Sequence, residues 1–126
     1  MKLAQEHGEG RYAITAYGPG GVRVNETVHR ESLVVMPDLL LVTWGPDDPK
    51  GLTPEAFSPV LEMAPEIVLL GTGGRLVWPD REVRRLLQGA GIGLEVMDTA
   101  AACRTYNLIM AEGRRVAAAL LMPGRD

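Results

Sequence analysis

The sequence predicts a single mixed α/β domain, and the rhythm of its apolar residues is the main evidence. Residues 12–44 alternate short apolar runs with turn signals, which is typical of antiparallel strands. From Leu52 onward, apolar runs alternate with stretches of helical spacing, which is typical of parallel strands joined by helices. The length of 126 residues suits one domain. We expect three layers, with helices on one face of a mixed sheet and additional N-terminal β-structure on the other.

The N-terminal part of the chain divides into a tail and a set of short strands. Residues 1–10 are polar and contain glycine, so we expect a loose tail before a folded region at 11–123. Residues 12–17 predict a strand, and the glycines and proline of 18–21 predict a tight turn. Further strands are expected at residues 22–25, 26–29, 34–36 and 39–44.

The middle of the chain begins with a loop and a helix start. Residues 45–51 are rich in proline, glycine and aspartate, which predicts a surface loop within one fold. Thr53 and Pro54 together are a helix-start signal. Because Pro59 interrupts the helical pattern, the helix is expected to be short, kinked or restarted at Ser58.

The remainder of the chain predicts strand, helix, strand, helix, strand. The continuous apolar run 67–70 is typical of a strand buried on both faces, and Asp80 can cap the helix that follows. The next strand is expected at 94–97, followed by a helix that Asp98 or Thr99 caps. Right-handed crossovers would make these strands and the last one, 116–121, parallel neighbours.

Composition limits the classes of function. The formal net charge is −3, with 13 basic and 16 acidic residues, which argues against nucleic-acid binding. The apolar run of residues 39–42 is too short to span a membrane. The single cysteine, Cys103, lies among alanines and is expected to be a buried packing residue. The N-terminal residues lack the apolar stretch of a signal peptide, so the cytoplasm is the expected compartment.

The carboxyl ends of the expected parallel strands define where a ligand site would lie. A glycine-rich turn at 71–74 follows one strand, and the start of a helix follows the next. Free N–H groups at a helix start favour an anion, and Arg104 could supply a counter-charge. The candidate ligand-binding residues are Gly71, Thr72, Gly73, Thr99, Arg104 and Asn107.

Helical spacing places these side chains on different faces of the third helix. At 100° per residue, an apolar face toward the sheet contains Ala102, Cys103, Tyr106, Ile109 and Met110. Asn107 borders this face, and Arg104 points away from its centre.

Each candidate also has a structural interpretation. The 71–74 turn lacks the lysine of a phosphate-binding loop and fits a tight strand-to-helix turn. Thr99 fits a helix cap, and Asn107 fits a partner for buried backbone groups. Arg104 could serve only as a structural ion pair, with Glu112 or Glu95 as its partner. The two tryptophans, Trp44 and Trp78, are expected to pack in the core or at its rim.

Residues of conventional catalysis are sparse. Histidine occurs twice, at His7 and His29, and no histidine, cysteine and aspartate group has metal-ligand spacing. The serines lack the context of a nucleophile elbow. We therefore assign no catalytic residue, no metal and no cofactor from the sequence.

Five stretches of the chain are specific when taken together: 17–21 with Val24 and Asn25, then 71–73, 91–99, 104–107 and 112–120. Together they resemble the Mth938-like domain family, which includes mitochondrial complex I assembly factor 3. The resemblance covers residues 17–123. It implies a compact three-layer α/β domain with no established enzymatic activity, and mitochondrial members that work with partner proteins.

Two functional hypotheses follow. The first is a non-enzymatic interaction protein, similar to an assembly factor, with a protein partner and an exposed apolar patch through which homodimerisation would also be possible. The alternative is a small-anion-binding protein or enzyme whose site lies at the 71–74 turn and the start of the 99–110 helix. The alternative expects Arg104 in a concave pocket without a carboxylate partner.

Overall fold

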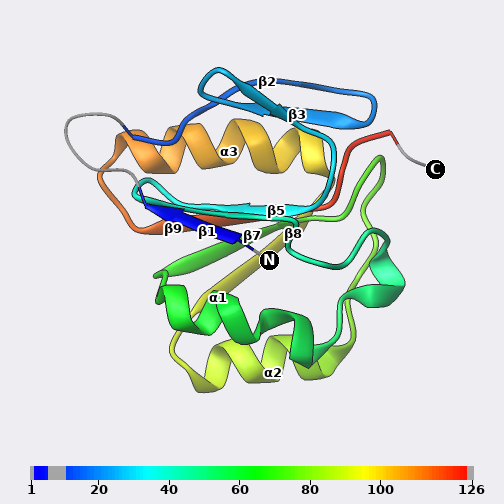
Figure 1. Cartoon of the computed structure of the whole chain (residues 1–126). Helices are drawn as coiled ribbons and strands as arrows, with labels where there is room; N and C mark the ends of the chain where they lie inside the picture. Colours follow the sequence, from blue (N-terminus) through cyan, green and yellow to red (C-terminus); the bar gives the residue numbers. More distant parts are fainter. Residues whose placement is uncertain (1, 6–10, 125–126) are drawn as a thin grey trace.

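The structure, a computed structural model, describes residues 2–5 and 11–124 and contains a large and a small sheet (Figure 1). The large sheet is six-stranded, in the order β1-β6-β5-β9-β7-β8, and the small sheet has the order β2-β3-β4. The strands of the large sheet are β1 (Lys2–Gln5), β5 (Leu33–Val35), β6 (Leu39–Val42), β7 (Ile67–Gly71), β8 (Gly93–Met97) and β9 (Val116–Leu120). Those of the small sheet are β2 (Ile14–Gly18), β3 (Gly21–Val24) and β4 (Thr27–His29).

The three strands expected to be parallel neighbours are confirmed as such. β7 pairs in parallel with β8 on one side and with β9 on the other. The N-terminal half joins the same sheet through β5, which pairs antiparallel with β9 and with β6. The predicted mixed α/β class is therefore correct.

The helices lie on both faces of the large sheet, which differs from the expected arrangement. α1 (Ser58–Met63) and α2 (Arg81–Gly89) cover one face, whereas α3 (Thr99–Ala111) covers the other (Figure 1). The crossover through α2 steps from β7 outward to β8, and the crossover through α3 steps back past β7 to β9. Two right-handed crossovers that run in opposite directions place their helices on opposite faces. The small sheet then packs on the outer side of α3 and forms a fourth layer.

The N-terminal tail also differs from expectation. Lys2–Gln5 form β1, which pairs antiparallel with β6 and ends the large sheet on one side. The remaining tail residues, 6–10, lie outside the described residues. Pairing with β6 gives the backbone N–H and C=O groups of β1 hydrogen-bond partners. No sequence pattern within the tail predicts this pairing.

Helix boundaries follow the local signals. Two 3₁₀ segments, η1 (Pro49–Gly51) and η2 (Pro54–Phe57), precede α1. The helix restarts at Ser58, which is one of the three alternatives that the sequence predicted. Asp80 caps α2 by accepting a hydrogen bond from the Glu82 N–H. Asp98, rather than Thr99, caps α3 by accepting from the Ala101 N–H at 2.8 Å.

Two apolar cores fill the spaces between the layers. One lies between the large sheet and α1 with α2, and includes Phe57, Leu70 and Leu87, all fully buried. The other lies between the large sheet, α3 and the small sheet, and includes Leu69, Cys103 and Tyr106. The face of α3 predicted to be apolar is the one that packs, because Ala102, Cys103 and Tyr106 are buried there. This packing fixes the position of the α3 start relative to the end of β7.

Candidate functional site

The carboxyl ends of β7 and β8 lie side by side, and their connections leave toward opposite faces of the sheet. In open α/β sheets this arrangement creates the crevice where ligands bind. Gly71 ends β7, and Asp98 with Thr99 follows β8, so the sequence brings the expected residues to the expected place.

Internal contacts fill the part of this crevice that lies between Gly71 and Thr99. Thr99 is fully buried, and its hydroxyl accepts from the Gly73 N–H at 2.8 Å and donates to the Leu121 carbonyl at 2.7 Å. A Cβ at Gly71 would lie 2.9 Å from both the Thr99 Oγ1 and a Leu120 methyl group. The start of α3 is therefore packed directly on the end of β7. The helix start already has a carboxylate cap, Asp98, which occupies the position an anion would take.

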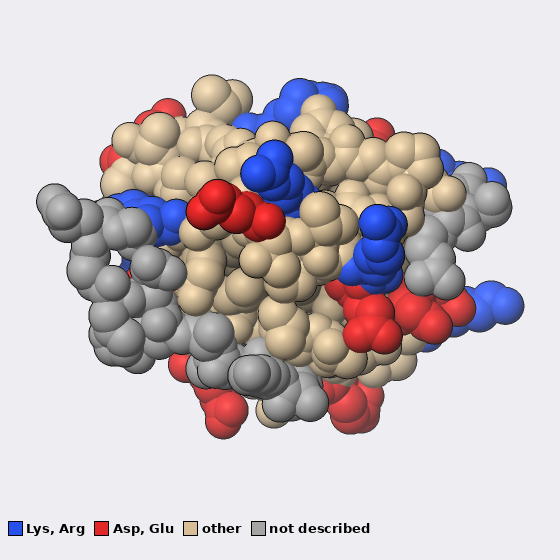
Figure 2. Space-filling view, turned by 45° about the horizontal axis from the view of Figure 1, so that its top comes forward, with Lys and Arg blue, Asp and Glu red and all other residues tan. Residues whose placement is uncertain are grey.

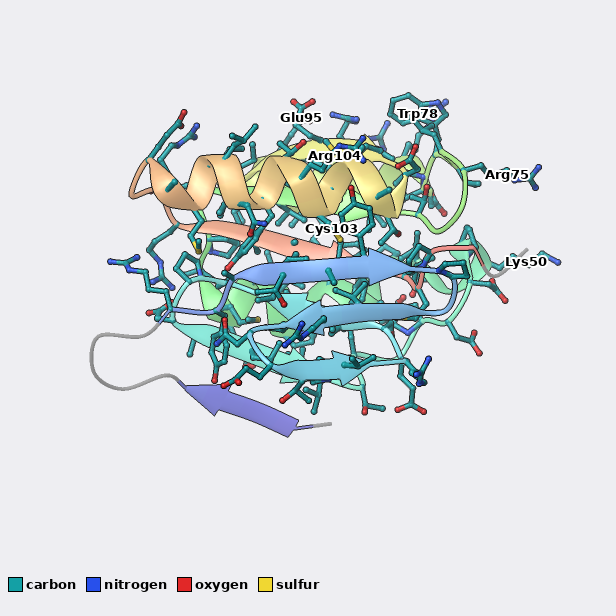
Figure 3. All side chains as sticks on the ribbon, turned by 90° about the horizontal axis from the view of Figure 1, so that it is seen from above. Lys50, Arg75, Trp78, Glu95, Cys103 and Arg104 are labelled. Atoms are coloured by element: carbon teal, nitrogen blue, oxygen red, sulfur yellow. The ribbon has the colours of Figure 1, made fainter. Side chains whose placement is uncertain are left out.

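Asn107 and Arg104 contact the small sheet instead of a common ligand. The Asn107 side chain accepts from the Ile14 N–H at 3.0 Å and donates to the Ile14 carbonyl at 2.7 Å. Arg104 is exposed, and its guanidinium donates to the Tyr17 hydroxyl at 2.9 Å (Figure 3). This hydrogen bond raises the pKa of Arg104. Among the described residues, Arg104 forms no ion pair with Glu112 or Glu95.

Thr72 shapes the loop that follows β7, which we call the 73–79 loop. Its hydroxyl donates to the Arg75 carbonyl at 2.6 Å and accepts from the Val77 N–H at 3.0 Å. On this clamped loop, Leu76 is 45% exposed and Trp78 is 65% exposed. The expectation that both tryptophans pack in the core or at its rim is wrong for Trp78, since it projects into solvent (Figure 3). Trp44 is buried and packs edge-on against Phe57.

The 73–79 loop also separates two hollows in the surface. The first has a volume of about 320 Å³ and lies beside the ends of β7 and β9. The second, about 360 Å³, is shallower and lies toward Tyr17 and Ala100. Thr72 and Gly73 line the first and Gly73 the second, whereas Gly71, Thr99, Arg104 and Asn107 line neither. The first hollow is lined by Asp47, Asp48, Pro49, Thr72, Gly73, Gly74, Arg75, Val77, Leu121 and Met122.

Sequence reasoning missed one wall of the first hollow. Asp47, Asp48 and Pro49 were assigned to a surface loop, which is correct, but nothing in the sequence placed that loop beside the 71–74 turn. The contact is long-range, and only the order of strands in the sheet creates it.

The titratable groups near α3 are unsuited to nucleophilic chemistry. Burial raises the pKa of the Cys103 thiol to about 12, with Arg104 opposing the shift, so the thiol stays protonated at neutral pH. His29 lies on β4, and partial burial lowers its pKa. Within residues 2–5 and 11–124, no group of three or more histidine, cysteine, aspartate or glutamate side chains could hold a metal ion.

Comparison with known proteins identifies the family. A family model described as a protein of unknown function (DUF498/DUF598) matches residues 14–121. The chain belongs to this family. An uncharacterized protein of Rhodobacter capsulatus is 35% identical over 91% of this chain and 89% of its own length. NADH dehydrogenase [ubiquinone] 1 alpha subcomplex assembly factor 3 of Danio rerio is 32% identical over 98% of this chain and 71% of its own length.

Solved structures agree with the fold. A Mth938-like domain protein of Bordetella pertussis superposes with a TM-score of 0.78 at 32% identity, over 97% of this chain and 92% of that one. The predicted resemblance to the Mth938-like family is therefore confirmed.

The face shown in Figure 2 carries acidic and basic side chains in small separate groups between broad uncharged areas, without a continuous basic patch. In the part of the chain that the structure describes, no helix has the length and apolar character needed to cross a membrane.

Proposed function

We propose that the protein is a non-enzymatic interaction protein, similar to an assembly factor, that contacts a protein partner through the 73–79 loop. The observation that carries this proposal is the exposure of Trp78. Tryptophan is enriched among the residues that dominate binding energy at protein interfaces. The hydrogen bonds of Thr72 hold this loop in one conformation, so less conformational entropy is lost when a partner binds.

The relatives support the same class of function. The Danio rerio relative is named an assembly factor of NADH dehydrogenase, and this chain corresponds to 71% of its length. The partner of this chain depends on the surface residues that this chain presents. A cytoplasmic location belongs to the proposal, since the single cysteine is a buried free thiol and proteins of reducing compartments rarely depend on disulfides.

A small-anion site at the 71–74 turn is the second candidate, and one observation favours it. The hollow of about 320 Å³ is within the volume range of small-molecule sites, about 300–1,000 Å³. Thr72 and Gly73 lie in its wall, and Arg75 supplies a cation. Two carboxylates, Asp47 and Asp48, line the same hollow and would repel an anion, which makes this candidate the weaker one.

The test is affinity capture from an extract of the protein's own cells, with three versions of the tagged protein. The first is the native chain, the second carries Leu76→Ala and Trp78→Ala, and the third carries Val28→Ala. Val28 is 51% exposed on β4, so its replacement controls for the loss of exposed apolar area elsewhere. We expect a partner that the native chain and the Val28 variant retain and that the loop variant loses.

The opposite outcome is equally clear. If the loop variant captures every protein that the native chain captures, the proposed interaction surface is wrong. A thermal-shift screen against anionic metabolites then decides the second candidate. Stabilisation by an anion that disappears with Arg75→Ala would favour it, with Arg104→Ala tested beside it.

A further inference from the structure

The large sheet ends at β8 with an unpaired edge. β8 is the terminal strand among the described residues and pairs only with β7. The Gly93 N–H donates to the Glu66 carbonyl, and the Met97 carbonyl accepts from the Thr72 N–H, so these two residues direct their backbone toward β7. Because backbone groups alternate along a strand, the N–H and C=O of Leu94 and Val96 point away from β7, into the open edge.

One side of this edge is uncovered. Leu94 and Val96 pack toward the core beneath α2, so their side chains are not available. On the opposite face Glu95 is exposed and Met97 is half-buried, since α3 packs on β7 and β9 and stops short of β8. This face of β8 is therefore left uncovered beside α3. Leu108, on α3, is 70% exposed.

We propose that β8 accepts an extended segment of the partner protein as an additional antiparallel or parallel strand, with a lysine or arginine of that segment opposite Glu95. This inference rests on the proposed interaction function and names the kind of partner segment and its docking place. Strand addition to a sheet edge obtains affinity from main-chain hydrogen bonds and specificity from alternate side chains.

Glu95 provides the charge selection. It is the central residue of β8, it is exposed, and no ion pair or side-chain hydrogen bond involves it among the described residues. A basic residue directly opposite it would be favourable, and an acidic one unfavourable. A second copy of this chain is disfavoured for the same reason. Antiparallel pairing of all five residues of two β8 strands would set Glu95 against Glu95, with Cβ atoms about 5 Å apart.

The edge is continuous with the 73–79 loop. The Thr72 N–H donates to the carbonyl of Met97, the last residue of β8. The Thr72 hydroxyl accepts from the N–H of Val77, which precedes Trp78 in the chain. Glu95 and Trp78 project from the same side of the molecule, opposite the edge formed by β1 (Figure 3). A strand that extends past Met97 would therefore bring its next side chains toward Leu76 and Trp78.

The experiment selects binders from a random dodecapeptide library displayed on phage and compares four proteins. The native chain is expected to enrich peptides with alternating aliphatic residues and a central lysine or arginine. Glu95→Lys is expected to reverse the preference to glutamate or aspartate. Val96→Pro removes one N–H at the open edge, a position where a strand tolerates proline, and is expected to weaken binding at least tenfold. Val96→Ala, the matched control, loses the same side chain but keeps the N–H and should bind like the native chain.

Amide hydrogen exchange measured by NMR locates the bound peptide. In the free protein, the Leu94 and Val96 amides should exchange faster than that of Glu95, and a selected peptide should slow both at least tenfold. This measurement uses the native chain, so it decides the proposal even if Val96→Pro fails to fold.

Four results would overturn the inference. One is a library that yields no enriched peptide. Another is a peptide that binds without slowing Leu94 and Val96. The third is slow exchange of these amides in the free protein that disappears on dilution, which would identify a second copy as the occupant. Peptides that depend on Trp78 but not on Val96 or Glu95 would refute strand addition and leave the interaction function standing.

Discussion

Replacing Thr99 by valine removes one hydroxyl from a fully buried position and leaves the shape of the side chain almost unchanged. The hydroxyl accepts from the Gly73 N–H and donates to the Leu121 carbonyl, so both backbone groups lose their partner. Each unsatisfied buried group costs about 1–3 kcal/mol. With partial relaxation we expect Thr99→Val to lower the free energy of unfolding by about 2–4 kcal/mol.

Urea unfolding followed by circular dichroism measures this change as a lower midpoint at constant slope. In a domain of this size the melting temperature should fall by roughly 8–15 °C. Thr105→Val is the matched control. The Thr105 hydroxyl only donates to the Ala101 carbonyl within α3, so its loss should cost less than about 0.5 kcal/mol.

A neutral Thr99→Val variant would refute the reasoning. It would mean that the hydroxyl does not hold the turn after β7 to the start of α3, and that Thr99 is free to contact a ligand. Equal destabilisation by the two variants would also contradict it, because the loss would then follow from placing valine in a helix.

The other predictions concern the small sheet, the thiol and a pair of arginines. Asn107→Ala should destabilise by about 1–3 kcal/mol and accelerate amide exchange in β2 and β3, because the side chain bonds both backbone groups of Ile14. Cys103 should resist alkylation at pH 8 until the protein unfolds. Since folding raises its pKa from 9.0 to about 12, stability should fall as the pH rises above about 9, and less steeply in Cys103→Ala. Arg115→Met should cost about 1–2 kcal/mol by urea unfolding, because the guanidinium bonds both Asp38 oxygens and the Met63 carbonyl. Arg114→Met should cost less than about 0.5 kcal/mol, because among the described residues its side chain makes a single ion pair, a 3.7 Å approach to exposed Glu66.

Local patterns predicted most of the elements. Helical spacing placed Cys103 and Tyr106 on the buried face of α3 and Arg104 on the exposed one, as observed. Pro59 predicted a helix that is short, kinked or restarted at Ser58, and the structure shows the restart at Ser58. These features depend on the periodicity of neighbouring residues, which the sequence contains directly.

Features that depend on distant residues could not be predicted. The side chain of Asn107 bonds the backbone of Ile14, 93 positions earlier, and no pattern within α3 names that partner. The two faces taken by the helices depend on the order of strands in the large sheet, in which β7 lies between β8 and β9. β1 depends on the free edge of β6. In each case the deciding contact joins segments that are far apart in the sequence.

The candidate site illustrates why one sequence pattern can indicate two opposite roles. A glycine turn next to a polar helix start suits a ligand when the strand end and the helix are far enough apart to admit one. Here a Cβ at Gly71 would already be 3.0 Å from the Thr99 Cα, so the same residues serve close packing. Function is then better sought among groups that folding leaves without an internal partner. Among the described residues, such groups include the edge-facing backbone of Leu94 and Val96 and the exposed ring of Trp78, which lie along one side of the domain.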